Sequence, residues 1–177
     1  RLSQKKVLIT GGSGFIGTNL VNALLDCTDF CITILDSKIP TFIKKSKRLN
    51  FVQGDLSDKF LLKNLFAQNS FDIVYHLAWN SIPESSLEDP EEEVKLNLVN
   101  SLNLINISYL NSVGKFIFLS SGGTVYGNAL YSPIKENHPK SPLNPYGITK
   151  LAVEKFIEMH GFLNDFKYII LRPSVPY

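Results

Sequence analysis

The chain has 177 residues, of which 44% are hydrophobic and 19% are charged, and its formal net charge is +2. This composition suits one globular domain with an ordinary hydrophobic core. The small net charge argues against nucleic acid or an anionic membrane surface as a partner, and no apolar run reaches the ~18 residues that a membrane span needs.

The N-terminal stretch, from Arg1 to Lys6, leads directly into a predicted strand, so we expect no signal peptide. The two cysteines, Cys27 and Cys31, lie at a predicted helix end and a predicted strand start. We interpret them as reduced packing residues of a cytoplasmic protein, because a metal site would need further ligands nearby.

Strands and helices are predicted to alternate along the chain. The strands are expected at 5–10, 31–36, 50–53, 72–77, 115–120 and 168–171, and the helices at 14–26, 58–68, 90–112 and 145–160, the last with Gly161 as its C-cap. Continuously apolar strands that alternate with helices are typical of a parallel sheet covered on both faces. We therefore predict one α/β domain over residues 1–177, a Rossmann-type doubly wound parallel sheet of order 3-2-1-4-5-6. Ligands of such a sheet bind above the carboxyl ends of its strands.

A glycine-rich turn joins the first strand to the first helix. The apolar run Val7 to Ile9 is followed by Gly11, Gly12, Gly14 and Gly17, and apolar residues then recur at helical spacing. Glycines in this pattern form the tight turn, let a pyrophosphate approach the backbone and let the helix pack closely on the strand. The helix N-terminus offers free N–H groups to the phosphates. The pattern predicts a dinucleotide site.

Asp36 ends the second predicted strand, nineteen residues after Gly17. A carboxylate there accepts hydrogen bonds from the adenosine ribose and repels a 2′-phosphate, which favours NAD over NADP. The basic run 44–48 has two readings, a 2′-phosphate site or a solvated loop. Asp55, after the third strand, is either a hydrogen-bond acceptor for adenine or an acid at a helix entry.

Tyr146 and Lys150 are four residues apart on the last predicted helix, so their side chains share one face. A phenol is a poor base at neutral pH, because its pKa is near 10. We expect the Lys150 ammonium, with the positive nicotinamide ring, to lower the pKa of Tyr146. Tyr146 would then remove a hydroxyl proton while hydride leaves the same carbon.

Six stretches of the sequence together resemble the extended short-chain dehydrogenase/reductase family, within it the NAD-dependent epimerase/dehydratase group and most of all its UDP-hexose 4-epimerases. The stretches are Thr10–Gly17, Leu35–Asp36, Gly54–Leu56, His76–Ala78, Ser120–Gly127 and Tyr146–Lys150. The resemblance covers nearly the whole chain. It implies NAD as cofactor, a nucleotide sugar as substrate and an isomerase reaction.

The resemblance also implies a role for each matching residue. Tyr146 would be the catalytic base and Lys150 would bind the nicotinamide ribose. The residues implied to contact the cofactor are Gly11, Gly14, Phe15 and Ile16 at the pyrophosphate, Asp36 at the ribose, Asp55 and Leu56 at the adenine, Leu77 and Ala78 after the fourth strand, and Asn97 near the nicotinamide.

One position departs from the family pattern. The family usually places a catalytic Ser or Thr three residues before the valine of its Val-Tyr-Gly triplet, and this chain has Gly122 there. Ser121 or Thr124 can supply the hydroxyl instead, and the sequence leaves both open. The 4,6-dehydratases carry an Asp-Glu pair where this chain has Gly123 and Thr124, so we favour epimerisation over dehydration.

The resemblance further implies a homodimer formed through the helices near 90–112 and 145–160. It also implies a smaller C-terminal substrate domain, which is absent from this sequence, and the chain stops soon after the last strand, so we expect a fragment of a longer chain. Two alternatives stay open: a dehydratase, reductase or decarboxylase of the same family, and an NAD-binding module without activity.

Several other polar or aromatic residues have structural interpretations. His76 ends a buried strand and is interpreted as a core histidine. The acids Glu91 to Glu93 follow Pro90, a good first helical residue, so we interpret them as complements to the helix dipole rather than as metal ligands. Trp79 either contacts a substrate or forms a wall of the core.

Overall fold

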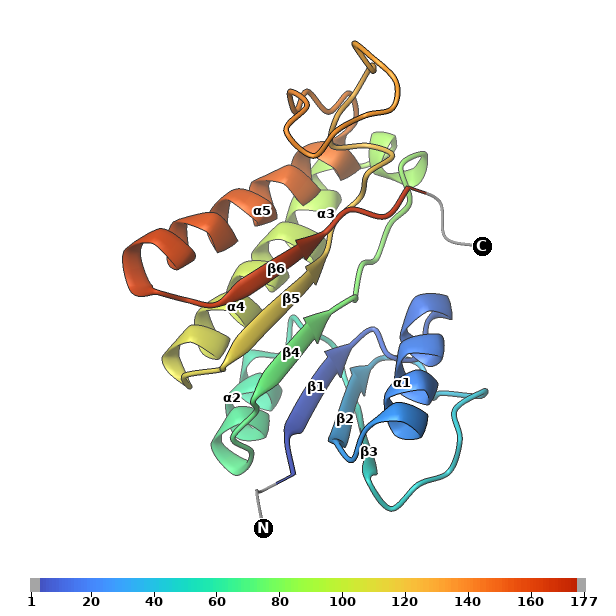
Figure 1. Ribbon diagram of the computed structural model, residues 1–177, viewed down its shortest axis with the longest axis vertical. Coiled ribbons are helices and arrows are strands. Elements are labelled where there is room, and N and C mark those ends of the chain that lie inside the picture. The colour runs from blue at the N-terminus through green and yellow to red at the C-terminus, as the bar shows by residue number, and fades with distance from the viewer. Residues whose placement is uncertain (1–3, 175–177) are drawn as a thin grey trace.

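The computed structural model describes residues 4–174, which form one six-stranded parallel sheet (Figure 1). Its strand order is β3-β2-β1-β4-β5-β6, so the predicted topology is confirmed. The strands are β1 (Lys6–Thr10), β2 (Cys31–Asp36), β3 (Leu49–Gln53), β4 (Ile73–His76), β5 (Lys115–Leu119) and β6 (Tyr168–Leu171).

The helices connect these strands in sequence. They are α1 (Phe15–Cys27), α2 (Lys59–Gln68), a 3-10 turn (Ser85–Leu87), α3 (Pro90–Glu93), a π-helical segment (Val94–Val99), α4 (Asn100–Leu110) and α5 (Pro145–Asn164). Figure 1 shows α1 on one face of the sheet and α2, α4 and α5 on the other.

The apolar strand residues bury two clusters of side chains, one on each face of the sheet. Under α1, the cluster includes Val7, Ile9 and Val21. The larger cluster lies under α2, α4 and α5 and includes Leu8, Phe116 and Phe118. The inner strands β1, β2 and β5 are buried on both faces, as the uninterrupted apolar runs in the sequence predicted, whereas the edge strands β3 and β6 have no buried residue.

Two helix predictions need correction. The helix predicted over 90–112 is one continuous rod, but its middle, Val94–Val99, is π-helical. The last helix does not end at Gly161. It continues to Asn164, and Asp165 takes the left-handed conformation that terminates it. A Cβ on Gly161 would lie 2.3 Å from the Tyr168 ring, so this glycine allows β6 to pack against α5.

The carboxyl ends of all six strands meet at one edge of the sheet, where the loops that carry the sequence motifs gather (Figure 1). The irregular stretch predicted at 122–144 lies beyond this edge, between β5 and α5. Among the described residues, no helix is both long and apolar enough to cross a membrane. Residues 1–3 and 175–177, which belong to the two ends discussed above, lie outside the described part.

Candidate active site

A cavity of about 330 Å³ opens at the carboxyl edge, above β1, β2 and β4. Eight of the residues predicted to contact the cofactor line it: Gly11, Gly14, Asp36, Asp55, Leu56, Leu77, Ala78 and Asn97. Phe15 and Ile16 do not line the cavity. They begin α1 beside it, where the first N–H groups of a helix have no acceptor within the helix.

The glycine turn is closely packed against its surroundings. Gly11 has a φ of +74°, and a Cβ there would lie 2.6 Å from the backbone nitrogen of Ala78. A Cβ on Gly17 would lie 2.3 Å from the carbonyl oxygen of Gly11, so no side chain fits between α1 and the turn. Gly14 differs, because its nearest neighbour would be 3.5 Å away. Gly14 therefore leaves space at the N-terminus of α1, the place where a phosphate binds.

Asp36 is held at the cavity wall by backbone donors. The backbone N–H of Ser13 donates to its Oδ2 at 2.9 Å, and the N–H of Lys38 donates to its Oδ1 at the same distance. The carboxylate thus links the glycine turn to the end of β2 before any ligand arrives. Asp55 also lines the cavity. Its Oδ1 accepts the N–H of Ser57, just before α2, so Asp55 can be both an acid at a helix entry and a residue of the cavity wall.

The first turns of α5 carry the predicted base. Asn144 caps this helix by accepting the N–H of Gly147, and Pro145 occupies its first position. Tyr146 and Lys150 follow one turn apart, and the Lys150 Nζ lies 5.6 Å from the centre of the Tyr146 ring. The shared face predicted for the two side chains is confirmed.

Trp79 stands between the cavity and these two side chains. Lys150 Nζ lies 3.6 Å from the centre of the Trp79 ring and donates to the carbonyl oxygen of Leu119 at 2.7 Å. The Tyr146 ring meets the Trp79 ring edge to face, with centres 5.8 Å apart. Trp79 packs on Phe118 and also lines the cavity, so it is part of the wall, and its contact with a substrate stays a prediction.

Burial is the main cause of the pKa shifts of the pair. It lowers the pKa of Lys150 to about 7, although Glu93 and Glu154 oppose the change. Burial also raises the pKa of the Tyr146 phenol, and the negative charge of Glu93 raises it further. The protein's own side chains thus raise the pKa of the Tyr146 phenol, and the lowered pKa predicted from the sequence, which includes the positive nicotinamide ring, stays a prediction.

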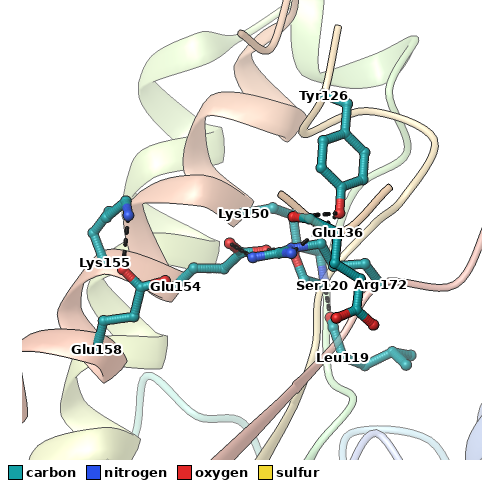
Figure 2. Close-up of polar contacts among 9 residues, drawn as sticks. All are labelled: Leu119, Ser120, Tyr126, Glu136, Lys150, Glu154, Lys155, Glu158 and Arg172. Atoms are coloured by element: carbon teal, nitrogen blue, oxygen red, sulfur yellow. Dashed lines mark hydrogen bonds and ion pairs between the residues drawn. The ribbon is translucent and has the colours of Figure 1, made fainter. Parts of the chain in front are cut away.

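A buried ionic network fixes α5 against the end of the sheet (Figure 2). Glu154, with no exposed surface, receives two hydrogen bonds of 2.8 Å from Arg172 and one of 2.5 Å from Ser120. Arg172 also donates to the Tyr126 hydroxyl at 3.1 Å. Since Glu154 is one turn after Lys150, the network sets the position of the lysine relative to β5 and β6.

Glu93 corrects one sequence interpretation. Glu91 and Glu92 are exposed near the start of α3, as residues that complement a helix dipole should be, whereas Glu93 is only 3% exposed. Its Oε2 accepts hydrogen bonds from Ser81 and from Asn97. A run of three acids gives no sign that one of them turns inward, so the sequence analysis missed this residue.

Ser121 and Thr124 are the two residues that could replace the hydroxyl of the family's Ser or Thr. A Cβ on Gly122 would lie 2.6 Å from the carbonyl oxygen of Arg172, so that position has no room for a side chain. The Oγ1 of Thr124 is buried without a hydrogen-bond partner. Ser121 and Thr124 are both partly exposed as residues, so the burial of the Thr124 Oγ1 atom is what distinguishes them. A buried hydroxyl without a hydrogen-bond partner costs free energy. We therefore favour Thr124 over Ser121 as the hydroxyl that would bond to a ligand.

The remaining polar candidates have structural roles. His76 is buried between the hydroxyls of Thr10 and Ser101, at 2.9 and 2.8 Å, and burial lowers its pKa to about 3, so the interpretation as a core histidine is confirmed. Within residues 4–174, no three His, Cys, Asp or Glu side chains converge as a metal site requires.

Comparison with known proteins agrees with this geometry. Residues 7–177 match the model of the NAD dependent epimerase/dehydratase family. The UDP-glucose 4-epimerase of Halalkalibacterium halodurans is 34% identical over 94% of this chain and 49% of its own length. The dTDP-D-glucose 4,6-dehydratase of Mus musculus is 33% identical over 98% of this chain and 51% of its own.

Among solved structures, the UDP-glucose 4-epimerase of Thermus thermophilus in complex with NAD superimposes with a TM-score of 0.87. It is 30% identical in sequence, and the match covers 97% of this chain and 58% of that one. The chain thus spans about half the length of the curated relatives that it matches.

Proposed function

The chain belongs to the NAD-dependent epimerase/dehydratase family, and we propose that the whole protein is an NAD-dependent 4-epimerase of a nucleotide sugar, with a UDP-hexose as substrate. Residues 1–177 would be its NAD-binding domain. The observation that carries the proposal is the position of the Tyr146–Lys150 pair. It adjoins, through Trp79, a cavity whose other wall is the glycine turn.

The cavity residues fit NAD. The open space at Gly14 and the N-terminus of α1 suit a pyrophosphate, and the Asp36 carboxylate suits an unphosphorylated ribose. Leu56 and Asp55 would contact the adenine, and Asn97 would lie on the nicotinamide side. When bound, NAD takes a hydride from a sugar carbon and returns it.

Each catalytic side chain has a distinct task in this proposal. Tyr146 removes the proton of the C4 hydroxyl and later returns it. Lys150 binds the nicotinamide ribose and, when protonated, opposes the effect of Glu93 on the Tyr146 phenol. Thr124 donates a hydrogen bond to the sugar oxygen, with Ser121 as the less favoured source. Inversion at C4 would require the keto-sugar to turn over in the site, so that its opposite face is reduced.

The test is conversion of UDP-glucose into UDP-galactose by the purified full-length protein without added NAD, together with identification of the nucleotide that denaturation releases. We expect conversion and released NAD. Released NADP would show that the basic run 44–48 outweighs Asp36 and would favour a reductase. Bound NAD without conversion of any UDP-sugar would leave only a binding module and contradict the proposal.

We further propose that the protein forms a homodimer through the helices near 90–112 and 145–160. The support is an apolar outer surface on these helices, which lie side by side: Val99 and Leu110 on the first, and Phe156, Met159, Phe162 and Leu163 on α5 are exposed. Light scattering should give twice the subunit mass, and Phe162→Glu should give a monomer.

A cytoplasmic location is part of the same proposal, and fractionation of cells tests it.

A further inference from the structure

Glu93 is a buried carboxylate that the described residues, 4–174, satisfy only in part. Its Oε2 has two donors, but its Oε1 is buried with no hydrogen-bond partner. A carboxylate oxygen that is removed from water without a donor is costly, so a donor from outside these residues, such as a ligand, would stabilise it. A ligand group that donates a hydrogen bond would satisfy the Glu93 Oε1.

The neighbours of Glu93 hold its carboxylate in one orientation. The backbone N–H of Asn80 donates to the Asn97 Oδ1 at 2.9 Å, so the Asn97 Nδ2 must point the other way. This Nδ2 donates to the Glu93 Oε2 at 3.0 Å, and the Ser81 hydroxyl donates to the same oxygen. Oε1 is therefore the oxygen left free to accept a hydrogen bond from outside the network.

Glu93 lines a second cavity, of about 210 Å³, that shares Asn80, Leu96 and Asn97 with the cofactor cavity. Ser86 is part of its wall and accepts the backbone N–H of Tyr146 at 3.1 Å. The second cavity thus adjoins both the cofactor cavity and the start of α5, the helix that carries Tyr146. A sugar whose hydroxyl is within reach of Tyr146 would lie near this junction.

The charge of this second cavity is one-sided. Glu88, Asp89, Glu92 and Glu93 line it, and within residues 4–174 no lysine or arginine does, although the charge of Glu93 also acts on Lys150 nearby. Such a surface attracts hydrogen-bond donors, whereas an additional carboxylate would be repelled at short range.

We propose that Glu93 selects the sugar: its free Oε1 accepts a hydrogen bond from a hydroxyl of the hexose, so that the site takes neutral hexoses and rejects hexuronates. This inference rests on the proposed function and specifies its substrate class. Glu93 is a specificity-determining residue here, separate from the base Tyr146 and from the cofactor contacts.

The variant Glu93→Gln tests the contact without changing its shape. Asn97 and Ser81 both donate to one oxygen, so the glutamine must place its own oxygen there and its NH₂ group at the Oε1 position. The acceptor offered to the sugar becomes a donor, and its charge is lost. The matched control is Glu91→Gln, which removes an exposed carboxylate two residues earlier in the same helix.

The measurement is calorimetric titration of the full-length protein carrying Tyr146→Phe, which stops turnover, with UDP-glucose, its 2-, 3- and 6-deoxy analogues, and UDP-glucuronate. One deoxy analogue should bind about 10- to 100-fold more weakly than UDP-glucose. Glu93→Gln should reduce that preference by about tenfold and should strengthen UDP-glucuronate binding by a similar factor. NAD affinity should be unchanged, as in Glu91→Gln.

The contrary outcomes are distinct. If the sugar preferences in Glu93→Gln stay within about twofold of the parent, or if all sugars and NAD weaken together, Glu93 is structural and the inference is wrong. If the parent protein binds UDP-glucose and the wild type converts it, the proposed function survives that failure. If the parent binds no UDP-sugar, both are overturned.

Discussion

The two ends of the active-site region differ in how completely the protein satisfies its own polar groups. At the glycine-turn end, Asp36 has backbone donors on both oxygens, and the turn is packed to backbone contact at Gly11 and Gly17. At the α5 end, Glu93 Oε1, Thr124 Oγ1 and the indole nitrogen of Trp79 are buried without hydrogen-bond partners. At the first end the described residues supply these hydrogen bonds, whereas at the second they leave three buried polar atoms without a partner.

We infer from this difference that the glycine-turn end serves cofactor binding and that the α5 end serves the reaction of the sugar. A surface whose donors and acceptors are already arranged loses little conformational freedom when a cofactor binds. Unsatisfied groups near the base gain hydrogen bonds only when substrate arrives, so their interaction energy is available to orient the sugar. Substitutions at the two ends should therefore change different measured quantities.

The largest effect is expected at the α5 end, from Tyr146→Phe. Loss of the proton acceptor should reduce kcat by about 10²- to 10⁴-fold, whereas the NAD content should stay near that of the wild type. Steady-state kinetics and nucleotide extraction measure the two quantities. Tyr131→Phe, in the exposed loop before α5, is the control that should retain full activity. Retained turnover in Tyr146→Phe would refute the assignment of the base.

At the glycine-turn end, Gly14→Ala should change NAD affinity, whereas Gly17→Ala should change the stability of the fold. The new methyl group at position 14 has room in the protein but occupies the phosphate space, so we expect a folded protein with NAD affinity reduced about 10- to 100-fold. The methyl group at position 17 collides with backbone, so Gly17→Ala should lower the melting temperature. Thermal unfolding and NAD titration separate the two, and a strongly destabilised Gly14→Ala would contradict this comparison.

Asp36→Asn tests whether this carboxylate determines the preference for NAD over NADP. It removes the charge that repels a 2′-phosphate, while one side-chain oxygen still accepts a backbone N–H. The preference for NAD over NADP should fall by about tenfold, measured as the ratio of the two dissociation constants. Asp26→Asn, on the outer surface of α1, should leave this ratio unchanged. An unchanged ratio in Asp36→Asn would assign cofactor choice to another group.

A smaller effect concerns stability and pH. The pKa of Lys150 is about 7 in the folded protein and near its ordinary 10.5 when unfolded, so between these values the unfolded chain binds the additional proton. The free energy of unfolding should therefore rise with pH from about 7 toward 10. Above pH 10 the raised pKa of Tyr146 reverses the trend, because the unfolded phenol ionises first.

Lys150→Met should flatten the rise between pH 7 and 10, which urea unfolding at several pH values measures. Lys155→Met, which removes an exposed lysine on the same helix, is the control and should keep the wild-type slope. Equal slopes in the two variants would show that Lys150 is not the titrating group.

The sequence predicted the strand order and the glycine-turn end well, because both depend on local patterns: apolar runs, glycine spacing and an acid at a strand end. It predicted the α5 end only in part. The Tyr146–Lys150 pair follows from helical spacing, but the inward turn of Glu93 and the ring of Trp79 under Lys150 depend on packing between segments far apart in the chain.

Local rules also failed at Gly161, where a glycine suggested a helix end. Its role is set by Tyr168, a residue of the next strand, which packs where a side chain would otherwise be. The same reasoning applies to Gly122, whose space is filled by the backbone of Arg172. In both cases a distant segment decides what the residue does, and a single sequence carries no signal of that contact.

The most direct test of the central claim, that Tyr146 acts as base while a hydride leaves and returns to the same sugar carbon, is an isotope measurement. The full-length protein is incubated with UDP-glucose that carries deuterium at C4, and the product is analysed by mass spectrometry and NMR. We predict UDP-galactose that retains its deuterium at C4. Product that has exchanged this deuterium with solvent, or no product from a protein that holds NAD, would contradict the account.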